Sequence, residues 1–201
     1  MTRREGAHEM RTAAATLLLA ALLAAPARAE DGLTVGARAG LGFAFGKVDG
    51  GTASSINDFI PGSFPLWLEL GYRFDRHWSL VGFFQYGPAT TDACPANDCN
   101  ASDQRLGATA IYRFDPGSFT PWMGFGTGYE WLNVGRGAPI RAGGLELSLQ
   151  AGGDFRVSSA VGVGPYLCFS VGQFTEVTPQ PVADKTTHGW VQVGVKATFD
   201  L

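Results

Sequence analysis

The stretch GWVQVGVKATFDL, residues 189–201, ends the chain on a strand pattern. From Val191 onward every second residue is apolar, and the residues between are polar or glycine, which is the period of a half-buried β-strand. A strand still in register at its last residue needs a hydrogen-bonding partner, because an open edge invites pairing with other chains. We therefore expect this strand to close onto the first strand of a barrel.

The same alternation recurs along the rest of the chain. Only 16% of the residues are charged, which is low for a soluble surface, and the 28 glycines and 14 phenylalanines favour turn-rich, aromatic all-β structure. With the closing stretch, the pattern predicts eight strands, most of them near the length that a tilted strand needs to cross a bilayer. The seven earlier stretches are 33–46, 64–74, 78–86, 105–114, 119–131, 145–157 and 160–172.

The expected connections alternate between short and long. Short turns fall at 75–77, 115–118 and 158–159, and the second contains the Pro and Gly that reverse turns favour. Long polar stretches fall at 47–63, 87–104, 132–144 and 175–188. This layout predicts an all-β, eight-stranded antiparallel up-and-down transmembrane β-barrel with short periplasmic turns and long extracellular loops.

The two faces of the expected strands decide between membrane and water. One face is continuously apolar, with aromatic residues near both strand ends, as expected of girdles at two lipid–water interfaces. A soluble lipocalin-like barrel would reverse this polarity and is disfavoured, as is a β-sandwich. The other face carries charges that must pair inside a narrow lumen. They are Arg38, Glu69, Arg73, Arg105, Arg113, Glu130, Glu146, Asp154, Arg156, Lys196 and Asp200.

The N-terminal residues have the pattern of a secretory signal peptide. Basic residues precede the apolar run AAATLLLAALLAA, and small residues end it at Ala29, so residues 1–29 are interpreted as a signal peptide and 30–201 as the barrel domain. Translation could start at Met1 or at Met10, which opens a complete signal by itself. The formal net charge of −3 excludes a basic nucleic-acid surface.

The cysteines fit an exported protein. Cys94 and Cys99 lie close together in a polar stretch, which predicts a local disulfide. A zinc site is disfavoured because no histidine is near. Cys168 lies within a strand pattern. A calcium site is the remaining alternative for this polar stretch, with the ligand types of Asp92, Asn97, Asp98 and Asp103 but no recognised spacing.

Nothing in the strand patterns indicates catalysis or a cofactor. His77 falls in a turn, and His188, near Asp184 and Thr187, could face inward at the loop end. A lipid-modifying enzyme would place a histidine with a serine or carboxylate near the rim, and no strand holds a histidine and serine two residues apart. Eight strands leave room only for side chains, so we expect no solute flow, although water or protons could leak.

Inward aromatic residues leave two interpretations open. By phase, Trp67 and Trp190 point inward near the loops, with Phe83 and Tyr166 between them and Trp122 near the turns. They could line a hydrophobic pocket, as in the OmpW type of small barrel. The favoured interpretation is that they plug the lumen and stack on arginines.

The whole pattern, from about Leu33 to the closing VKATFDL, resembles the small outer-membrane β-barrel families, of which the OmpX-like and OmpA transmembrane-domain-like proteins are nearest in kind. The resemblance implies a location in the outer membrane of a Gram-negative type of bacterium. It also implies insertion by the barrel-assembly machinery, which reads an alternating last strand that usually ends in Phe or Trp. Here Phe199 and Leu201 carry that signal, and Leu201 departs from the usual ending.

We therefore expect a non-catalytic integral outer-membrane barrel without a cofactor or metal. Its role would be structural, or a surface interaction through extracellular loops that contact a ligand. Its other partners would be outer-membrane lipid and the assembly machinery, and it would be a monomer. The alternative is a narrow channel or binder for small hydrophobic molecules. A lipid-modifying enzyme and a soluble lipocalin-like carrier are weaker alternatives.

Overall fold

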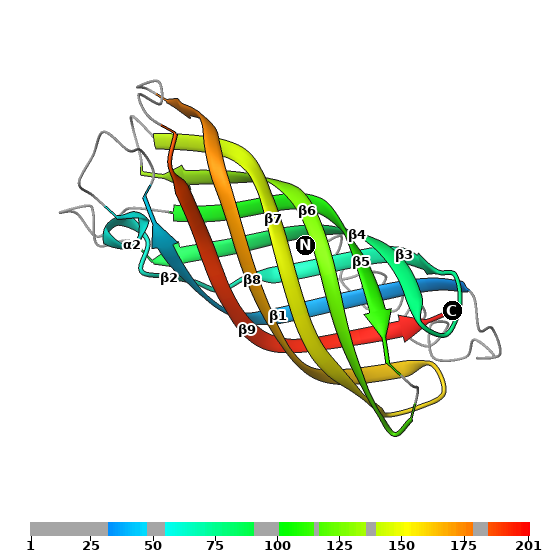
Figure 1. The fold of residues 1–201 in the computed structure, drawn as a ribbon. Helices are drawn as coiled ribbons and strands as arrows, with labels where there is room; N and C mark the ends of the chain where they lie inside the picture. The colour runs from blue at the N-terminus through cyan, green and yellow to red at the C-terminus, as the bar shows by residue number, and fades with distance from the viewer. Residues whose placement is uncertain (1–31, 48–54, 91–100, 115–116, 136–139, 179–184) are drawn as a thin grey trace, which may run out of the picture.

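The computed structural model describes residues 32–47, 55–90, 101–114, 117–135, 140–178 and 185–201, and they form a single closed sheet of long, tilted strands (Figure 1). Each neighbouring pair is antiparallel, as the predicted up-and-down order requires. The strands are β1 (Gly32–Gly46), β2 (Gly62–Ser63), β3 (Leu66–Arg73), β4 (Trp78–Thr90), β5 (Ala101–Arg113), β6 (Phe119–Val134), β7 (Ile140–Arg156), β8 (Val161–Thr178) and β9 (Thr187–Asp200).

The sheet closes where the sequence predicts. β9 pairs with β1 from Asp200 opposite Thr34 to His188 opposite Gly46, so the first and last strands have no open edge. The eight long strands form the barrel, and the two-residue β2 only bridges β1 and β4 near one end. No helix among the described residues is long and apolar enough to cross a membrane.

The strands run further at one end than the sequence pattern indicates. β4 reaches Thr90, β6 reaches Val134 and β8 reaches Thr178, so much of the expected long loops is strand. The pairing continues there through small and polar residues, such as Ser102 opposite Asn133, which carry no apolar alternation. We call this end, where β4, β6 and β8 end, the loop end. The opposite end, where β3, β5 and β7 end, is the turn end.

The first loop contains a short helix, α2 (Ile56–Phe59), that lies over the barrel mouth at the loop end (Figure 1). Ser55 caps it, accepting a hydrogen bond from the amide of Asn57 at 3.3 Å and donating its hydroxyl to the Gly46 carbonyl at 2.9 Å. Ile56 and Ile60 are fully buried on the end of the lumen. We call the apolar cluster that they join the cap; it comprises Ala44, Ile56, Ile60, Ala101, Leu132, Val134, Ala142, Phe174 and Trp190.

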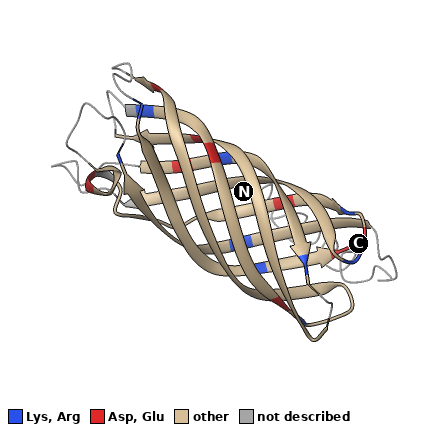
Figure 2. Cartoon of the chain, in the orientation of Figure 1, with Lys and Arg blue, Asp and Glu red and all other residues tan. Residues whose placement is uncertain are grey.

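The outer face is apolar, as the alternation predicts. Leu68 and Leu70 are 67% and 63% exposed, while their neighbours Trp67 and Glu69 are buried in the lumen. This polarity excludes a water-soluble barrel with an apolar interior. The long strands carry few charges along their length (Figure 2). Aromatic rings pair near both ends, Trp78 with Tyr112 and Phe119 with Phe155 at the turn end, and Tyr129 with Trp131 at the loop end.

Candidate functional site

The lumen holds the polar side chains of the barrel, and small residues make room for them. A Cβ atom added at Gly36 would lie 2.6 Å from Oε2 of Glu69, and one added at Gly40 would lie 2.8 Å from the hydroxyl of Tyr166. These glycines face inward on β1, where larger side chains of nearby strands lie over them. The inward side chains form two charged clusters at different heights.

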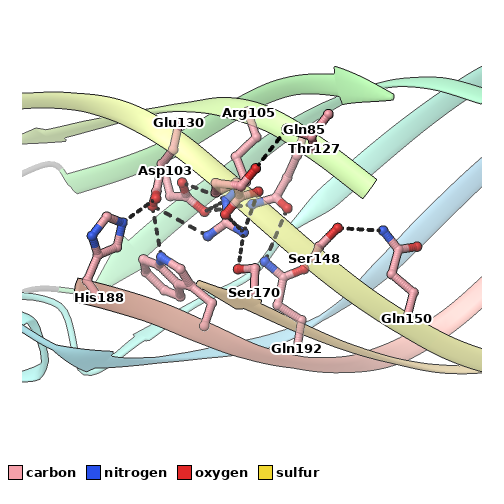
Figure 3. Close-up of polar contacts among 12 residues, drawn as sticks. Gln85, Asp103, Arg105, Thr127, Glu130, Ser148, Gln150, Ser170, His188 and Gln192 are labelled. Carbon is pink, nitrogen blue, oxygen red and sulfur yellow. Dashed lines mark hydrogen bonds and ion pairs between the residues drawn. The ribbon is translucent and has the colours of Figure 1, made fainter. Parts of the chain in front are cut away.

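The cluster nearer the loop end is built on Arg105 (Figure 3). Its guanidinium lies 3.1 Å from Asp103 through Nε, 3.0 Å from Glu146 through Nη1 and 3.5 Å from Glu130 through Nη2. His188 extends the group, with Nε2 2.7 Å from Oε2 of Glu130. We call these five residues the Arg105 cluster. They come from β5, β6, β7 and β9, so the cluster ties together strands on several sides of the barrel.

Neutral groups complete the hydrogen bonding of the Arg105 cluster. Trp190 donates its indole N–H to Glu130 at 2.8 Å, and Gln85 donates to Asp103 at 2.6 Å. Arg105 donates to the Ser170 hydroxyl at 3.1 Å, and its guanidinium lies 5.2 Å from the centre of the Trp190 ring. These contacts account for most of the buried polar atoms, as burial of charge requires.

The second cluster lies nearer the turn end and centres on Glu69. Its carboxylate forms ion pairs with Arg38 and, at 3.1 Å, with Nζ of Lys196. Arg38 also donates from Nη1 to Gln150 at 2.8 Å, and Gln150 donates to Thr109 at 3.3 Å. We call Arg38, Glu69, Lys196 and Gln150 the Arg38 cluster. Each member is buried, and the cluster crosses the lumen from β1 and β9 to β7.

Aromatic rings surround Arg38. The centre of its guanidinium lies 5.0 Å from the ring of Trp67, 5.3 Å from Trp122 and 5.1 Å from Tyr166. Distances of this size are typical of cation–π contact. Arg38 therefore occupies the space between rings that could otherwise line a pocket.

The four residues of the expected hydrophobic pocket lie in two separate clusters. Trp67, Phe83 and Tyr166 lie together with Trp122 and Cys168 in the middle of the lumen, whereas Trp190 belongs to the cap. Trp67 packs on Phe83 with ring centres 4.6 Å apart. The structure thus does not bring all four residues to one pocket.

The remaining expected lumen charges lie toward the turn end. Arg73 forms an ion pair with Asp200, and both are half-buried. Arg113 donates to Ser79 at 2.8 Å, and Asp154 accepts from the indole of Trp122 at 3.1 Å. Arg156 requires a correction: it was expected in the lumen but is exposed, because it is the last residue of β7 and lies beyond the enclosed part of the barrel.

Asp103 also requires a correction. The sequence pattern predicts Asp103 in a loop, as a candidate calcium ligand, but Asp103 is a fully buried lumen residue on β5. Two further residues, Gln85 and Ser170, which the sequence pattern does not single out, bind the same cluster. The inward phase of these two residues on β4 and β8 is the signal in the sequence that could have identified them.

Asp92, Asn97, Asp98 and the expected disulfide of Cys94 and Cys99 lie outside the described residues. Cys168 is a buried free thiol.

Two features at the turn end hold the chain in place. The amide of Leu201 donates a hydrogen bond to the Leu33 carbonyl at 2.9 Å, and Phe199 on β9 lies opposite Val35 and Val161. These contacts fix the ends of the closing strands.

In the turn after β3, the carboxylate of Asp75 accepts hydrogen bonds from the amides of His77 and Trp78 at 2.7 and 2.8 Å. The hydrogen bond from Trp78 and that from His77 lower the pKa of Asp75.

A closed eight-stranded antiparallel barrel, apolar outside and charge-paired inside, defines a small outer-membrane β-barrel protein. Residues 14–164 match the family model described as the outer membrane protein beta-barrel domain, and the chain belongs to this family. Its location is therefore the outer membrane.

Solved structures agree with the fold. The chain is similar to the crystal structure of Neisserial surface protein A, with 17% identity over 84% of this chain and 97% of that one, at a TM-score of 0.59. It is also similar to the solid-state NMR structure of the outer membrane protein AlkL in lipid bilayers, with 12% identity over 88% of this chain and 95% of that one, at a TM-score of 0.51. No curated protein sequence matches the chain.

Proposed function

We propose that this protein is a closed, non-catalytic outer-membrane barrel that presents its loop-end segments at the cell surface, in a structural or surface-interaction role. The observation that carries the proposal is the filled lumen. Side chains of the Arg105 and Arg38 clusters are at most 4% exposed and are bonded to one another across the barrel. An eight-stranded barrel has just enough interior for such side chains, so no continuous aqueous path remains.

The buried histidine does not support an enzymatic role. His188 is 1% exposed and its Nε2 is engaged by Glu130, so a lipid in the surrounding membrane has no access to it. The nearby hydroxyl of Ser170 accepts a hydrogen bond from Arg105. A nucleophile paired with a base would instead need a serine within hydrogen-bond reach of the imidazole and open to substrate.

Conductance measurements test the closed lumen. Residues 30–201, refolded and inserted into a planar lipid bilayer, should give no conductance steps. The variant with Ile56→Ala and Ile60→Ala should also stay closed, because the charged clusters lie beneath the cap. Regular conductance steps from the unaltered protein would overturn the proposal. Steps from the double variant alone would mean that the cap and not the charged clusters forms the seal.

A second candidate function is binding of small hydrophobic molecules. It is favoured by the apolar cap, in which Trp190 and Phe174 are buried together with Ile56 and Ile60. Binding of an environment-sensitive hydrophobic dye to the refolded protein tests this candidate. Weaker binding in Trp190→Ala and in Trp67→Ala would support it. Unchanged binding in both variants would exclude it and leave the closed barrel.

The partners proposed for this barrel follow from its surfaces. The exposed leucines and aromatic residues of the outer face fit membrane lipid. The closing strand, with Phe199 and Leu201, is proposed as the signal for the assembly machinery, and a surface ligand would bind at the loop end. The complete ring of strand pairs leaves no edge for pairing with a second copy, which supports a monomer. Chemical crosslinking in native membranes would test the monomeric state.

A further inference from the structure

The cap and the Arg105 cluster share contacts. Trp190 belongs to the cap through its ring and donates its indole N–H to Glu130. Phe174, also in the cap, stacks on His188 with ring centres 3.7 Å apart and an interplanar angle of 6°. His188 therefore lies with one ring face on the cap and one nitrogen on the charged cluster. A change in the charge of the cluster would therefore alter the packing of the cap.

The Arg105 cluster has more acid than base. Asp103, Glu130 and Glu146 surround one guanidinium, and all four groups are buried. Among the described residues, the other buried cations lie in the Arg38 cluster or at the turn end. In the part of the chain that the structure describes, His188 is the remaining member of the cluster that can gain a positive charge. Because unbalanced buried charge is costly, a proton on His188 stabilises the cluster.

The imidazole has one nitrogen engaged and one available. Nε2 lies 2.7 Å from Oε2 of Glu130. This distance fits a hydrogen bond donated by the Nε2–H group, whether the imidazole is neutral or protonated. Nδ1 is buried and has no hydrogen-bond partner among the described residues. Nδ1 is thus the atom that gains or loses the proton. Glu130 thus lies on one side of the imidazole ring, and the nitrogen on the other side is buried without an acceptor among the described residues.

We propose that the Arg105 cluster, through His188, forms a proton-binding site that controls the cap. With the proton bound at Nδ1, the imidazolium pairs with Glu130 of β6 and offsets the carboxylates of Asp103 on β5 and Glu146 on β7. Phe174 then stays stacked on His188, and the cap residues stay packed together. As pH rises and the proton leaves, the three carboxylates face Arg105 alone, their repulsion spreads the strand ends, and the cap loosens.

The sequence offers an unusually selective readout for this proposal. The chain contains four isoleucines, of which Ile56 and Ile60 lie in the cap and Ile111 lies in the middle of the lumen with Trp67. Methyl NMR of isoleucine-labelled residues 30–201 in lipid nanodiscs therefore reports on the cap, with Ile111 as an internal control. In a His77→Gln background, nitrogen NMR follows the protonation of His188 in the same sample.

The expected result is a shared transition. Across the pH range in which histidines titrate, the Ile56 and Ile60 signals should shift and broaden with the midpoint of His188, and Ile111 should stay unchanged. The His188→Gln variant keeps an N–H donor toward Glu130 but cannot take up the proton, and its cap signals should not respond to pH. Unmoved cap signals while His188 titrates, or the same response in His188→Gln, would overturn the proposal.

A second pair of variants tests the proposal even if His188→Gln does not fold. Glu146→Gln removes one of the excess carboxylates and should move the midpoint of the methyl transition to lower pH by about one unit. Glu176→Gln makes the same chemical change at an exposed position of β8 and should leave the midpoint in place. Equal midpoints in the two variants would contradict control by the Arg105 cluster.

Discussion

The two charged clusters of the lumen are built in opposite ways. In the Arg105 cluster one guanidinium faces three carboxylates, and in the Arg38 cluster one carboxylate, that of Glu69, faces two cations. The first is completed by a histidine and polar neutral groups, and the second by aromatic rings around Arg38. In each cluster the single group of the minority charge holds the others together.

This difference indicates on which residues the stability of the barrel depends. Removing the minority charge leaves like charges buried together, whereas removing one of the majority charges leaves the remaining ones still paired with the minority charge. The cost of a substitution should thus follow the charge left behind and not the size of the side chain. The following predictions test that rule, beginning with the variant expected to have the largest effect.

The largest effect is expected for Arg105→Met. This variant leaves three buried carboxylates without their common partner, and the free energy of unfolding should fall by about 3–5 kcal/mol. Urea unfolding in lipid vesicles, followed by the loss of the compact band in unheated gel samples, measures the change. Arg156→Met is the matched control, because Arg156 is exposed, and it should be nearly neutral. Similar losses in the two variants would contradict the central role of Arg105.

The Arg38 cluster should respond unequally to the loss of its two kinds of charge. Glu69→Gln leaves Arg38 and Lys196 unpaired and should cost about 3 kcal/mol, whereas Lys196→Met leaves the Arg38–Glu69 pair and should cost about 1 kcal/mol or less. The same urea assay compares them. A larger loss in Lys196→Met would show that the rule of the minority charge does not apply to this cluster.

A smaller effect is expected where the wall of the barrel makes room for the Arg38 cluster. The Cβ of Gly36→Ala would lie 2.6 Å from Oε2 of Glu69, so the carboxylate must move and its ion pairs lengthen. We expect a loss of about 1–3 kcal/mol in the free energy of unfolding. Gly82→Ala on the outer face, where the nearest atom to the new Cβ is 3.7 Å away, is the control and should change little.

The smallest effect is expected in the turn of Asp75, far from both clusters. Because the folded state lowers the pKa of Asp75, its stabilising contribution is present above the ordinary aspartate pKa and is lost as pH falls through the lower, folded value. The Asp75→Ala variant should therefore unfold slightly more easily near neutral pH and should match the unaltered protein in strong acid. A difference that persists in acid would point to another cause.

The fold was predictable from the sequence because strand alternation is a local signal. Leu68 and Glu69 differ in polarity at adjacent positions, and the pleat turns that difference directly into outside and inside. The closing pair of β1 and β9 also followed, because a terminal strand in register requires a partner. The inward phase likewise placed Arg38, Arg105 and Glu130 in the lumen.

The grouping of the lumen residues could not be predicted in the same way. Which charges meet depends on the stagger of the strands around the barrel, and the sequence pattern does not give the stagger. Asp103 was missed because the alternation fades among the small, polar residues at the start of β5. The cap was missed because Ile56 and Ile60 are only two apolar residues in a polar loop, and their burial depends on where that loop folds.

Double-mutant cycles in urea unfolding test whether the lumen is filled by two independently paired clusters. Glu130→Gln combined with His188→Gln should show a coupling of about 1–3 kcal/mol, since the two side chains are in contact. Glu130→Gln combined with Lys196→Met should be additive within about 0.5 kcal/mol, since these residues share no ion pair. Absent coupling in the first cycle, or equal coupling in both, would contradict the account.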